Sequence, residues 1–564
     1  MKRILILILI LVFFFPCFAS NSNQRIIPLS SSIYQKIDTL FLLEGKANVS
    51  KGRPWTTSEA LMVLNEIDST NTEGTKQIFK EIEEELLKKT KWKFDEITGV
   101  SLDLKLNSEF YVHTNSSFNR YEDWKVSYVD RKPLVNLSLE FVGSDFFYYD
   151  LDFLFGYGLY CEEDDLSAIN NYPSEIGCYA SGYSTPYGAT GEMLLYSPYY
   201  SSNIITNTMS NEYAWSKRGV LALGGDNWAV SYNRDKLDWG NSHIGNFIYD
   251  NHLDYLDYLR LVYFSPNLKA ESLFAFLTPY NAAPAEKPEE NFRIFLTHRL
   301  EFSPIKTLRF ALSGGVMYYN KKEALNLGYF NPATIYHNVE NASMFNALAS
   351  LEADWAFSPG WKLYFQGVMD QFTTANEDSD TAQPEASGII GGIEFANSLF
   401  DGIYTSSFEI AKTSPALYRR DRVDFIIAQK RLNRIGGAGG YFYIYDYLGF
   451  PYGGDCIAFG FNNSFFQSGL KLYLNFLGVL HGPTDMSDSY DDLKGLELFS
   501  SDTIDALFDL TLKAEKTILY RSNTSLIISI QLDLIDVSSI EKESFKFNDN
   551  KFDTQIVTSL TYSY

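Results

Sequence analysis

After its first fifteen residues, this chain of 564 residues contains no apolar run as long as a membrane-spanning helix requires, which is about 18 to 20 residues. We therefore expect no bundle of membrane helices. A membrane β-barrel needs no such run, because alternate residues of each strand face lipid and lumen. Aromatic residues make up 16% of the sequence, and glycines number 37. These residue types build the aromatic girdles and tight turns of membrane barrels, although a secreted soluble β protein is an alternative.

Cysteine and histidine are scarce, with four and six residues, and none has the spacing of a zinc site. Cys161 and Cys178 flank a polar stretch that follows a strong strand pattern, which predicts a disulfide that closes an exported loop. Cys456 then has no partner. The sequence contains no nucleophile elbow, phosphate loop or paired-histidine motif. We therefore predict that the protein is not an enzyme and holds no resident cofactor or metal.

Basic residues are also few, because 47 Lys and Arg stand against 70 Asp and Glu and give a net charge of −23. This balance excludes nucleic acid as a partner unless cations bridge the two. Acidic residues cluster in three loop-like stretches, which we interpret as solvated loops, with binding of a divalent cation or a sugar as the alternative. The stretches are 162–165, 377–380 and 485–492.

The amino-terminal residues have the pattern of an export signal. Lys2 and Arg3 precede an apolar run over 4–15, and Ala19 fits a cleavage site, so residues 1–19 are predicted to be a signal peptide. Lipidation at Cys17 is the alternative, and the bulky residues before it disfavour it.

Residues 24–95 have a helical pattern, unlike the rest of the chain. Apolar residues recur at spacings of three and four over 31–44 and again over about 75–91. Between these stretches, Thr56 and Glu59 have the spacing of a capping box, which predicts the start of another helix. We therefore expect a module of three helices before the barrel.

From residue 97 to residue 564 the period of the apolar residues changes from about 3.6 to 2. Even positions over 100–106 are apolar and odd positions are mostly polar. The stretch 341–357 looks helical by its alanines, yet it alternates in the same way. Acids on one face would be too costly in a dry sandwich core but are tolerated in a watered lumen. The sequence therefore predicts an all-β transmembrane antiparallel barrel of about 16 to 18 strands.

The final strand pattern places Ile556, Leu560, Tyr562 and Tyr564 on one face. An aromatic residue at the end of such a strand resembles the signal that the outer-membrane barrel assembly machinery recognises. The sequence thus predicts a location in the outer membrane of a diderm bacterium, in contact with its lipid.

Several phrases in the middle of the chain resemble the Wzi capsule-assembly family of outer-membrane proteins, and 53–59 is similar to that family's helical module. The phrases are 228–241, 245–247, 298–302, 329–332, 346–348 and 363–370. The resemblance implies an eighteen-stranded barrel with its helical module in the periplasm. It also implies a non-enzymatic protein that attaches exported polysaccharide to the cell surface.

Two groups of residues are candidates for function. The first combines a flat aromatic face with directed hydrogen-bonding groups, as carbohydrate sites do: Arg234, Asp238, Trp239, Asn241 and His243. The alternative is that Trp239 is an interfacial anchor and its charged neighbours form a lumen ion pair. The second group is expected to form a lumen network that stabilises the barrel or narrows its bore: His298, Arg299, Glu301, Asp354 and Asp370.

Two other functions remain open from the sequence. A polar lumen and an acidic balance favour a diffusion porin that prefers cations. The helical module favours a structural protein anchored to the cell wall, since 53–59 also resembles surface-layer anchoring segments.

Overall fold

The computed structural model shows how far the alternation of period two extends. It describes residues 23–68, 72–88, 90–95, 97–115, 125, 132–155, 178–180, 202–203, 218–277, 292–320, 345–371, 386–420, 423–435, 438–486, 488–521 and 524–564. The predicted signal peptide and the predicted Cys161–Cys178 pair lie outside the described residues or side chains. In the described part, no helix is long and apolar enough to cross a membrane.

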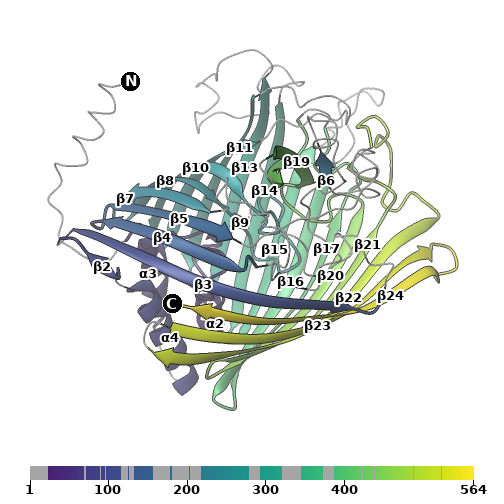
Figure 1. Cartoon of the computed structure of the whole chain (residues 1–564). Helices are drawn as coiled ribbons and strands as arrows, with labels where there is room; N and C mark the ends of the chain where they lie inside the picture. Colours follow the sequence, from purple (N-terminus) through teal and green to yellow (C-terminus); the bar gives the residue numbers. More distant parts are fainter. Residues whose placement is uncertain are drawn as a thin grey trace.

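The alternating segments form one closed antiparallel barrel of eighteen strands (Figure 1). Each strand pairs with its sequence neighbour in the barrel, and β24 closes the barrel by pairing with β3. The strands are β3 (Thr98–His113), β4 (Val135–Gly143), β5 (Phe147–Phe155), β7 (Gly219–Gly224), β8 (Trp228–Asp235), β10 (Leu256–Ser265), β11 (Leu268–Leu277), β12 (Phe292–Ile305), β13 (Leu308–Asn320), β14 (Phe345–Ser358), β15 (Trp361–Gln371), β16 (Ala386–Leu399), β17 (Gly402–Thr413), β20 (Cys456–Gln467), β21 (Leu470–His481), β22 (Thr503–Arg521), β23 (Thr524–Glu541) and β24 (Lys546–Ser563). The predicted fold and strand number are confirmed.

The remaining strands are short or lie outside the barrel wall. They are β1 (Gly52–Arg53), which pairs with β9 (Asp238–Trp239); β2 (Trp92–Lys93), which pairs with β3; and a sheet of β18 (Ile426–Ile435), β19 (Ala438–Tyr447) and β6 (Cys178–Ala180). At one end of the barrel, two or three residues join successive strands, as at 144–146, 266–267 and 359–360. We call this the short-turn end, and the opposite end, with the long connections, the loop end.

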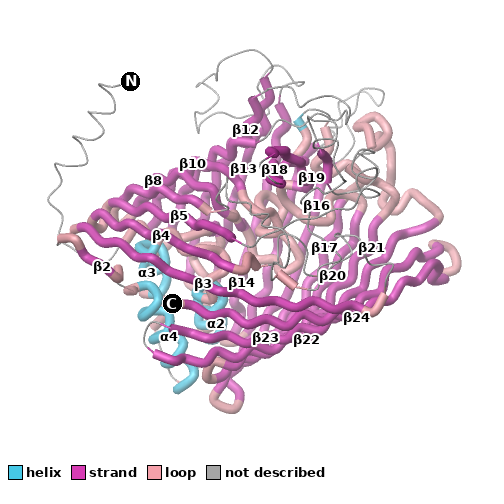
Figure 2. The backbone as a smooth tube through the Cα atoms, viewed as in Figure 1, coloured by secondary structure: helices cyan, strands magenta, loops and turns pink. Residues whose placement is uncertain are grey.

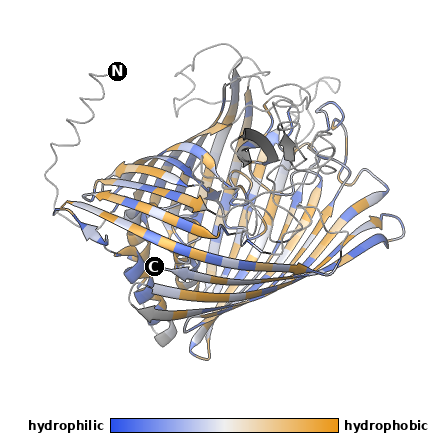
Figure 3. Cartoon of the chain, in the orientation of Figure 1, coloured by the Kyte–Doolittle hydropathy of each residue, from blue (hydrophilic) through white to orange (hydrophobic). Residues whose placement is uncertain are grey.

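The outer face of the wall is apolar. Along β14, Leu351 is 45% exposed while its neighbour Glu352 is 1% exposed, because successive residues point outward and inward. Figure 3 shows the same alternation of apolar and polar residues along the barrel strands. Aromatic rings gather towards both ends of this face: Trp228, Trp355, Phe357 and Trp361 near the short turns, and Phe459, Phe476, Phe508 and Phe547 towards the loops. An apolar band between two aromatic girdles is the surface of a transmembrane barrel.

Three helices precede the wall: α2 (Ile33–Leu43), α3 (Thr57–Leu64) and α4 (Glu73–Leu86). They share an apolar core around Trp55 and Ile37. The predicted capping box is present, since the Thr56 hydroxyl accepts from the Glu59 backbone and the Glu59 carboxylate accepts from the Thr56 backbone. The helices lie at the short-turn end, near the carboxyl terminus (Figures 1 and 2). There the Gly360 N–H donates to the Leu42 carbonyl at 2.7 Å.

Much of the lumen is filled with protein, contrary to the expected watered interior. One apolar core joins the segments 236–255 and 414–455 to inward side chains of the wall. The segments contribute Trp239, Phe247, Phe425 and Phe450, among others. The charges of the inward acids of β12 and β14 are balanced in this interior by buried arginines.

Candidate binding site in the barrel lumen

Two chain segments enter the lumen from opposite ends and meet inside it. Residues 46–56 come from the helical module, and residues 236–255 fold inward from the loop end. They pair as β1 and β9, with Gly52 opposite Trp239 and Arg53 opposite Asp238. A further hydrogen bond runs from Gly240 N–H to the Lys51 carbonyl at 3.3 Å. The two segments together obstruct the centre of the barrel.

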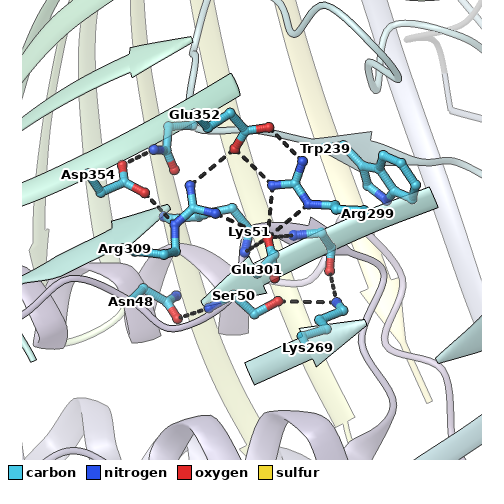
Figure 4. Close-up of polar contacts among 12 residues, drawn as sticks. Asn48, Ser50, Lys51, Trp239, Lys269, Arg299, Glu301, Arg309, Glu352 and Asp354 are labelled. Atoms are coloured by element: carbon cyan, nitrogen blue, oxygen red, sulfur yellow. Dashed lines mark hydrogen bonds and ion pairs between the residues drawn. The ribbon is translucent and has the colours of Figure 1, made fainter. Parts of the chain in front are cut away.

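The wall beside this junction carries a buried ion-pair cluster, the lumen cluster, shown in Figure 4. It consists of Arg299, Glu301, Arg309, Glu352 and Asp354. Arg299 contacts Glu301 at 2.8 Å and Glu352 at 2.6 Å, while Arg309 contacts the same two acids at 3.1 Å each and also pairs with Asp354. Each guanidinium thus binds two or more carboxylates, which satisfies charges that would be costly to bury alone.

The lumen cluster also holds the segment from the helical module. The backbone N–H groups of Lys51 and Gly52 both donate to Glu301 Oε1, at 2.9 and 3.0 Å. These two N–H donors add to the guanidinium groups of Arg299 and Arg309 in satisfying the Glu301 carboxylate. Glu301 therefore couples the barrel wall to β1.

Both predicted residue groups contribute to this one place. The Trp239 indole is 0% exposed, packs edge-on against Tyr249 with ring centroids 4.9 Å apart, and has the Arg299 guanidinium 5.5 Å from its own centroid. Asn241 donates a hydrogen bond to Asp354. Trp239 thus lies inside the lumen, so the alternative of an interfacial anchor is wrong. Its ring has no open face for a sugar in this arrangement.

The predicted positions of His298 and Arg234 are wrong, because both side chains point out of the barrel and not into the lumen. His298 shares its face with exposed Leu300, and its Nδ1 is 2.8 Å from Ser272 Oγ. It cannot join Arg299 and Glu301, since adjacent residues of a strand face opposite sides. Arg234 likewise lies on the outward side of β8, where it pairs with Asp257 at 2.6 Å.

Asp370 is also separate from the lumen cluster. It lies at the loop end of β15, where its Oδ2 accepts from the Tyr418 N–H at 3.1 Å. Among the described residues, no hydrogen bond or ion pair joins Asp370 to the cluster.

A second buried cluster was missed by the sequence analysis. Glu59 of α3 contacts Lys269 at 2.6 Å and Arg260 at 3.2 Å, and Glu271 contacts the same two cations at 3.2 and 2.7 Å. All four side chains are buried. This cluster fixes the helical module to the wall. Its barrel members, Arg260, Lys269 and Glu271, lie on the inward, polar face of β10 and β11. The alternation in the sequence could therefore have identified them as lumen residues.

The polar residues of the inward segment are held by local partners. Asn246 donates to Asp238 at 2.7 Å, and burial together with the nearby Asp250 carboxylate raises the pKa of Asp238 to about 7. His252 bridges Asp250 at 2.7 Å and Asp446 at 3.2 Å. Burial alone would lower its pKa, but these two acids raise the pKa of His252 to about 10.

His243 differs from its neighbours because its side chain is 46% exposed although it lies within the barrel. Its Nε2 is 3.2 Å from Glu394, and its backbone N–H donates to Glu409 at 2.9 Å. Burial opposes a charged imidazole, but the Glu394 hydrogen bond and the Glu409 charge raise the pKa of His243. Of the predicted sugar-binding group, His243 therefore has the clearest access to an interior space.

Of the three acidic stretches and the three cysteines after the predicted signal peptide, the structure describes the side chains of only one acidic stretch and of Cys456. The stretches 162–165 and 377–380 lie outside the described residues. In 485–492, Asp488 accepts from the Asp485 N–H at 2.9 Å and Asp492 accepts from the Ser489 hydroxyl at 2.6 Å. Where the structure describes the chain, no group of three or more His, Cys, Asp or Glu is arranged to hold a metal. Cys456 is a buried free thiol.

Comparison with known proteins supports the fold. No family model matches the sequence, and no curated protein is detectably similar to it. Among solved structures, the chain is similar to Wzi of Escherichia coli, an outer-membrane protein involved in group 1 capsule assembly and described as a carbohydrate-binding β-barrel. That match has a TM-score of 0.55 and 11% identity and covers 97% of this chain and 99% of Wzi.

Weaker matches include two further outer-membrane proteins. OprD of Pseudomonas aeruginosa has a TM-score of 0.36 and 9% identity, with 82% of this chain and 95% of OprD covered. OmpT of Vibrio cholerae has a TM-score of 0.31 and 8% identity, with 83% of this chain and 100% of OmpT covered. The fold of an outer-membrane β-barrel is supported by the match to Wzi, whose TM-score is 0.55.

Proposed function

We propose that this protein is an outer-membrane barrel that binds exported polysaccharide at the cell surface and does not conduct solutes or catalyse a reaction. Short turns of such barrels face the periplasm and long connections face outward. In this orientation the helical module is periplasmic and the loop end meets the surface polymer. Wzi, which shares the fold, is described as carbohydrate binding.

The observation that carries the proposal is the obstructed lumen. β1 and β9 meet in the centre, the lumen cluster binds β1 to the wall, and the apolar core around Phe247 and Phe425 fills the loop half. A diffusion porin needs a continuous watered path. Such packing disfavours the porin alternative and is compatible with a barrel that presents a binding surface.

Within the predicted sugar-binding group, we assign a supporting role to Asp238, Trp239 and Asn241. His243 lies beside Glu394 in the short-turn half of β16, so the apolar core separates it from the loop end and we assign it no contact with the surface polymer. Trp239 and Asn241 contact Arg299 and Asp354 and fix the inward segment. Arg234 and the outward His298 are not part of this site.

Planar-bilayer recording together with glycan-array binding tests the proposal. The purified barrel should be nearly silent, whereas a variant with residues 240–251 replaced by a short glycine linker should conduct. The intact barrel should bind at least one bacterial polysaccharide, and His243→Ala should leave that binding unchanged, because His243 lies on the short-turn side of the apolar core. Steady ion conductance by the intact protein without any glycan binding would favour the porin instead. A silent barrel that binds no polysaccharide would contradict the proposal.

A further inference from the structure

A second, separate space lies at the short-turn end. It is a cavity of about 1180 Å³ between the polar faces of α2 and α4 and the inner rim of the barrel wall. Residues from the short-turn ends of β17, β20, β21, β22, β23 and β3 line its wall side. Ligand pockets commonly hold about 300 to 1,000 Å³, so this cavity, here called the vestibule, has room for a sugar unit with substituents.

The wall side of the vestibule carries two ammonium groups that are free to meet a ligand. Lys105 and Lys471 both line the cavity. Within the described part of the chain, neither has an ion-pair or hydrogen-bond partner. Glu515 lies opposite Lys471 on the neighbouring strand and attracts it, but the Glu515 carboxylate makes its ion-pair contact with Lys513, at 2.9 Å. At the rim, by contrast, Lys88 and Lys91 both bind Asp103, at 3.1 and 2.8 Å.

The helix side carries charge of the opposite sign. Glu84 lines the vestibule from α4, and among the described residues its carboxylate has one ion-pair contact, with Lys80 at 3.7 Å, in which both side chains are well exposed. A contact of this kind in water contributes little. The neighbouring acids Glu81 and Glu85 are already engaged, by Lys36 at 2.9 Å and by the Ser31 hydroxyl at 2.7 Å. Gln35 and Thr39 of α2 add neutral hydrogen-bonding groups to the lining.

We propose that the vestibule binds a zwitterionic glycan of the periplasm, namely the glycopeptide of the cell wall. Such a glycan combines sugar hydroxyls with peptide carboxylates and a free amine. Lys105 and Lys471 meet carboxylates, Glu84 meets the ammonium group, and the amide and hydroxyl groups of α2 meet the sugar. The placement of opposite charges on opposite sides selects such a ligand over a neutral sugar or a purely acidic one. This inference shares only the barrel's orientation with the proposed surface function.

The test measures binding of a soluble cell-wall disaccharide-tetrapeptide to the full-length protein in detergent by isothermal titration calorimetry. The double variant Lys105→Gln/Lys471→Gln should raise the Kd about tenfold or more, because two charge contacts are lost. Lys551→Gln is the matched control, since Lys551 is an exposed lysine in the loop-end half of β24, at the other end of the barrel from the vestibule. It should leave the Kd within about twofold. Heat-modifiable gel mobility checks that every variant is a folded barrel.

A second comparison tests the helix side with a probe whose amine is acetylated. The acetylated probe should bind the unmodified protein several-fold more weakly than the parent probe, whereas Glu84→Gln should bind both equally. Glu83→Gln, at the adjacent exposed position on α4, should retain the discrimination. The proposal is overturned if the parent probe does not bind, if the double lysine variant binds it as the unmodified protein does, or if neutral chitotetraose binds equally well.

Discussion

Individual residues were predictable where the alternation was applied strictly, and not where sequence proximity replaced it. Arg299, Glu301 and Asp354 are inward and lie in one cluster, as expected. His298 and Arg234 were grouped with residues that face the other side of their strands. The same rule of parity, applied to β13 and β14, would have added Arg309 and Glu352. It gives no information about which inward residues are paired, because strand register is fixed only by the folded barrel.

Glu301 is the residue whose charge the lumen depends on most directly. It binds Arg299 and Arg309 and accepts two backbone N–H groups from the inserted segment. Glu301→Gln keeps the shape of the side chain but leaves two buried guanidinium groups with one fewer anion. We expect the free energy of unfolding to fall by about 3 to 5 kcal/mol, measured by denaturant unfolding in detergent micelles.

Glu543→Gln is the control for that substitution, because Glu543 is an exposed acid in the hairpin turn between β23 and β24. It should change stability by less than about 0.5 kcal/mol. If Glu301→Gln proves as mild as the control, the cluster does not carry the stability assigned to it.

At the scale of elements, the helices were predicted from local patterns but their place in the barrel was not. The capping box at Thr56 and Glu59 is a local signal, and the helix begins there. The ion pair of Glu59 with Arg260 joins residues 201 positions apart, and nothing in the local pattern encodes it. The inward folding of 236–255 was missed for the same reason. A loop that packs inside a barrel carries apolar residues that resemble strand residues.

The docking of segment 236–255 should weaken as pH rises from about 4 to 8. The pKa of Asp238 is raised to about 7 when the segment is docked, so the docked segment keeps a proton that the Asp238 carboxyl of a released segment loses above its ordinary pKa. Docking is therefore weakened as pH rises from that ordinary value through about 7. The raised pKa of His252, about 10, acts in the same direction from about pH 6.5 upward. Lys51, whose pKa burial lowers to about 8, opposes the trend only above pH 8.

Amide hydrogen exchange measures this effect once the rates are corrected for intrinsic pH dependence. Protection in 236–255 should be at least about tenfold lower at pH 8 than at pH 5, which corresponds to one pKa unit of difference. Asp238→Asn should remove the loss of protection that occurs below about pH 7, and His252→Gln should remove the loss that occurs above about pH 6.5. Equal pH dependence in both variants and the unmodified protein would contradict the assignment. The wall segment β23 serves as the internal reference.

At the scale of the whole molecule, the sequence was sufficient for the fold because lipid imposes one rule on every strand. Outward residues must be apolar across the band, and closure leaves no unpaired edge. That rule predicted about 16 to 18 strands, where the barrel has eighteen, and it predicted a strand within 341–357 despite the alanines there. It could not predict how full the lumen is. The interior requires only that polar groups be satisfied, and water, ion pairs or packed segments all meet that requirement.

The outer band can be tested by placing one charge in it. Leu351 lies near the middle of β14 and is 45% exposed on the outward face, so its environment is either hydrocarbon or water. In a bilayer, Leu351→Arg should lower barrel stability by about 2 to 4 kcal/mol, the depth-dependent cost for arginine near the midplane. Phe545→Arg is the comparison, because Phe545 is 78% exposed in the turn between β23 and β24, at the loop end, and should cost at most about 1 kcal/mol. Reversible unfolding from phospholipid vesicles gives both values. Equal and small costs at the two positions would mean that Leu351 faces water, and the band would not be a membrane surface.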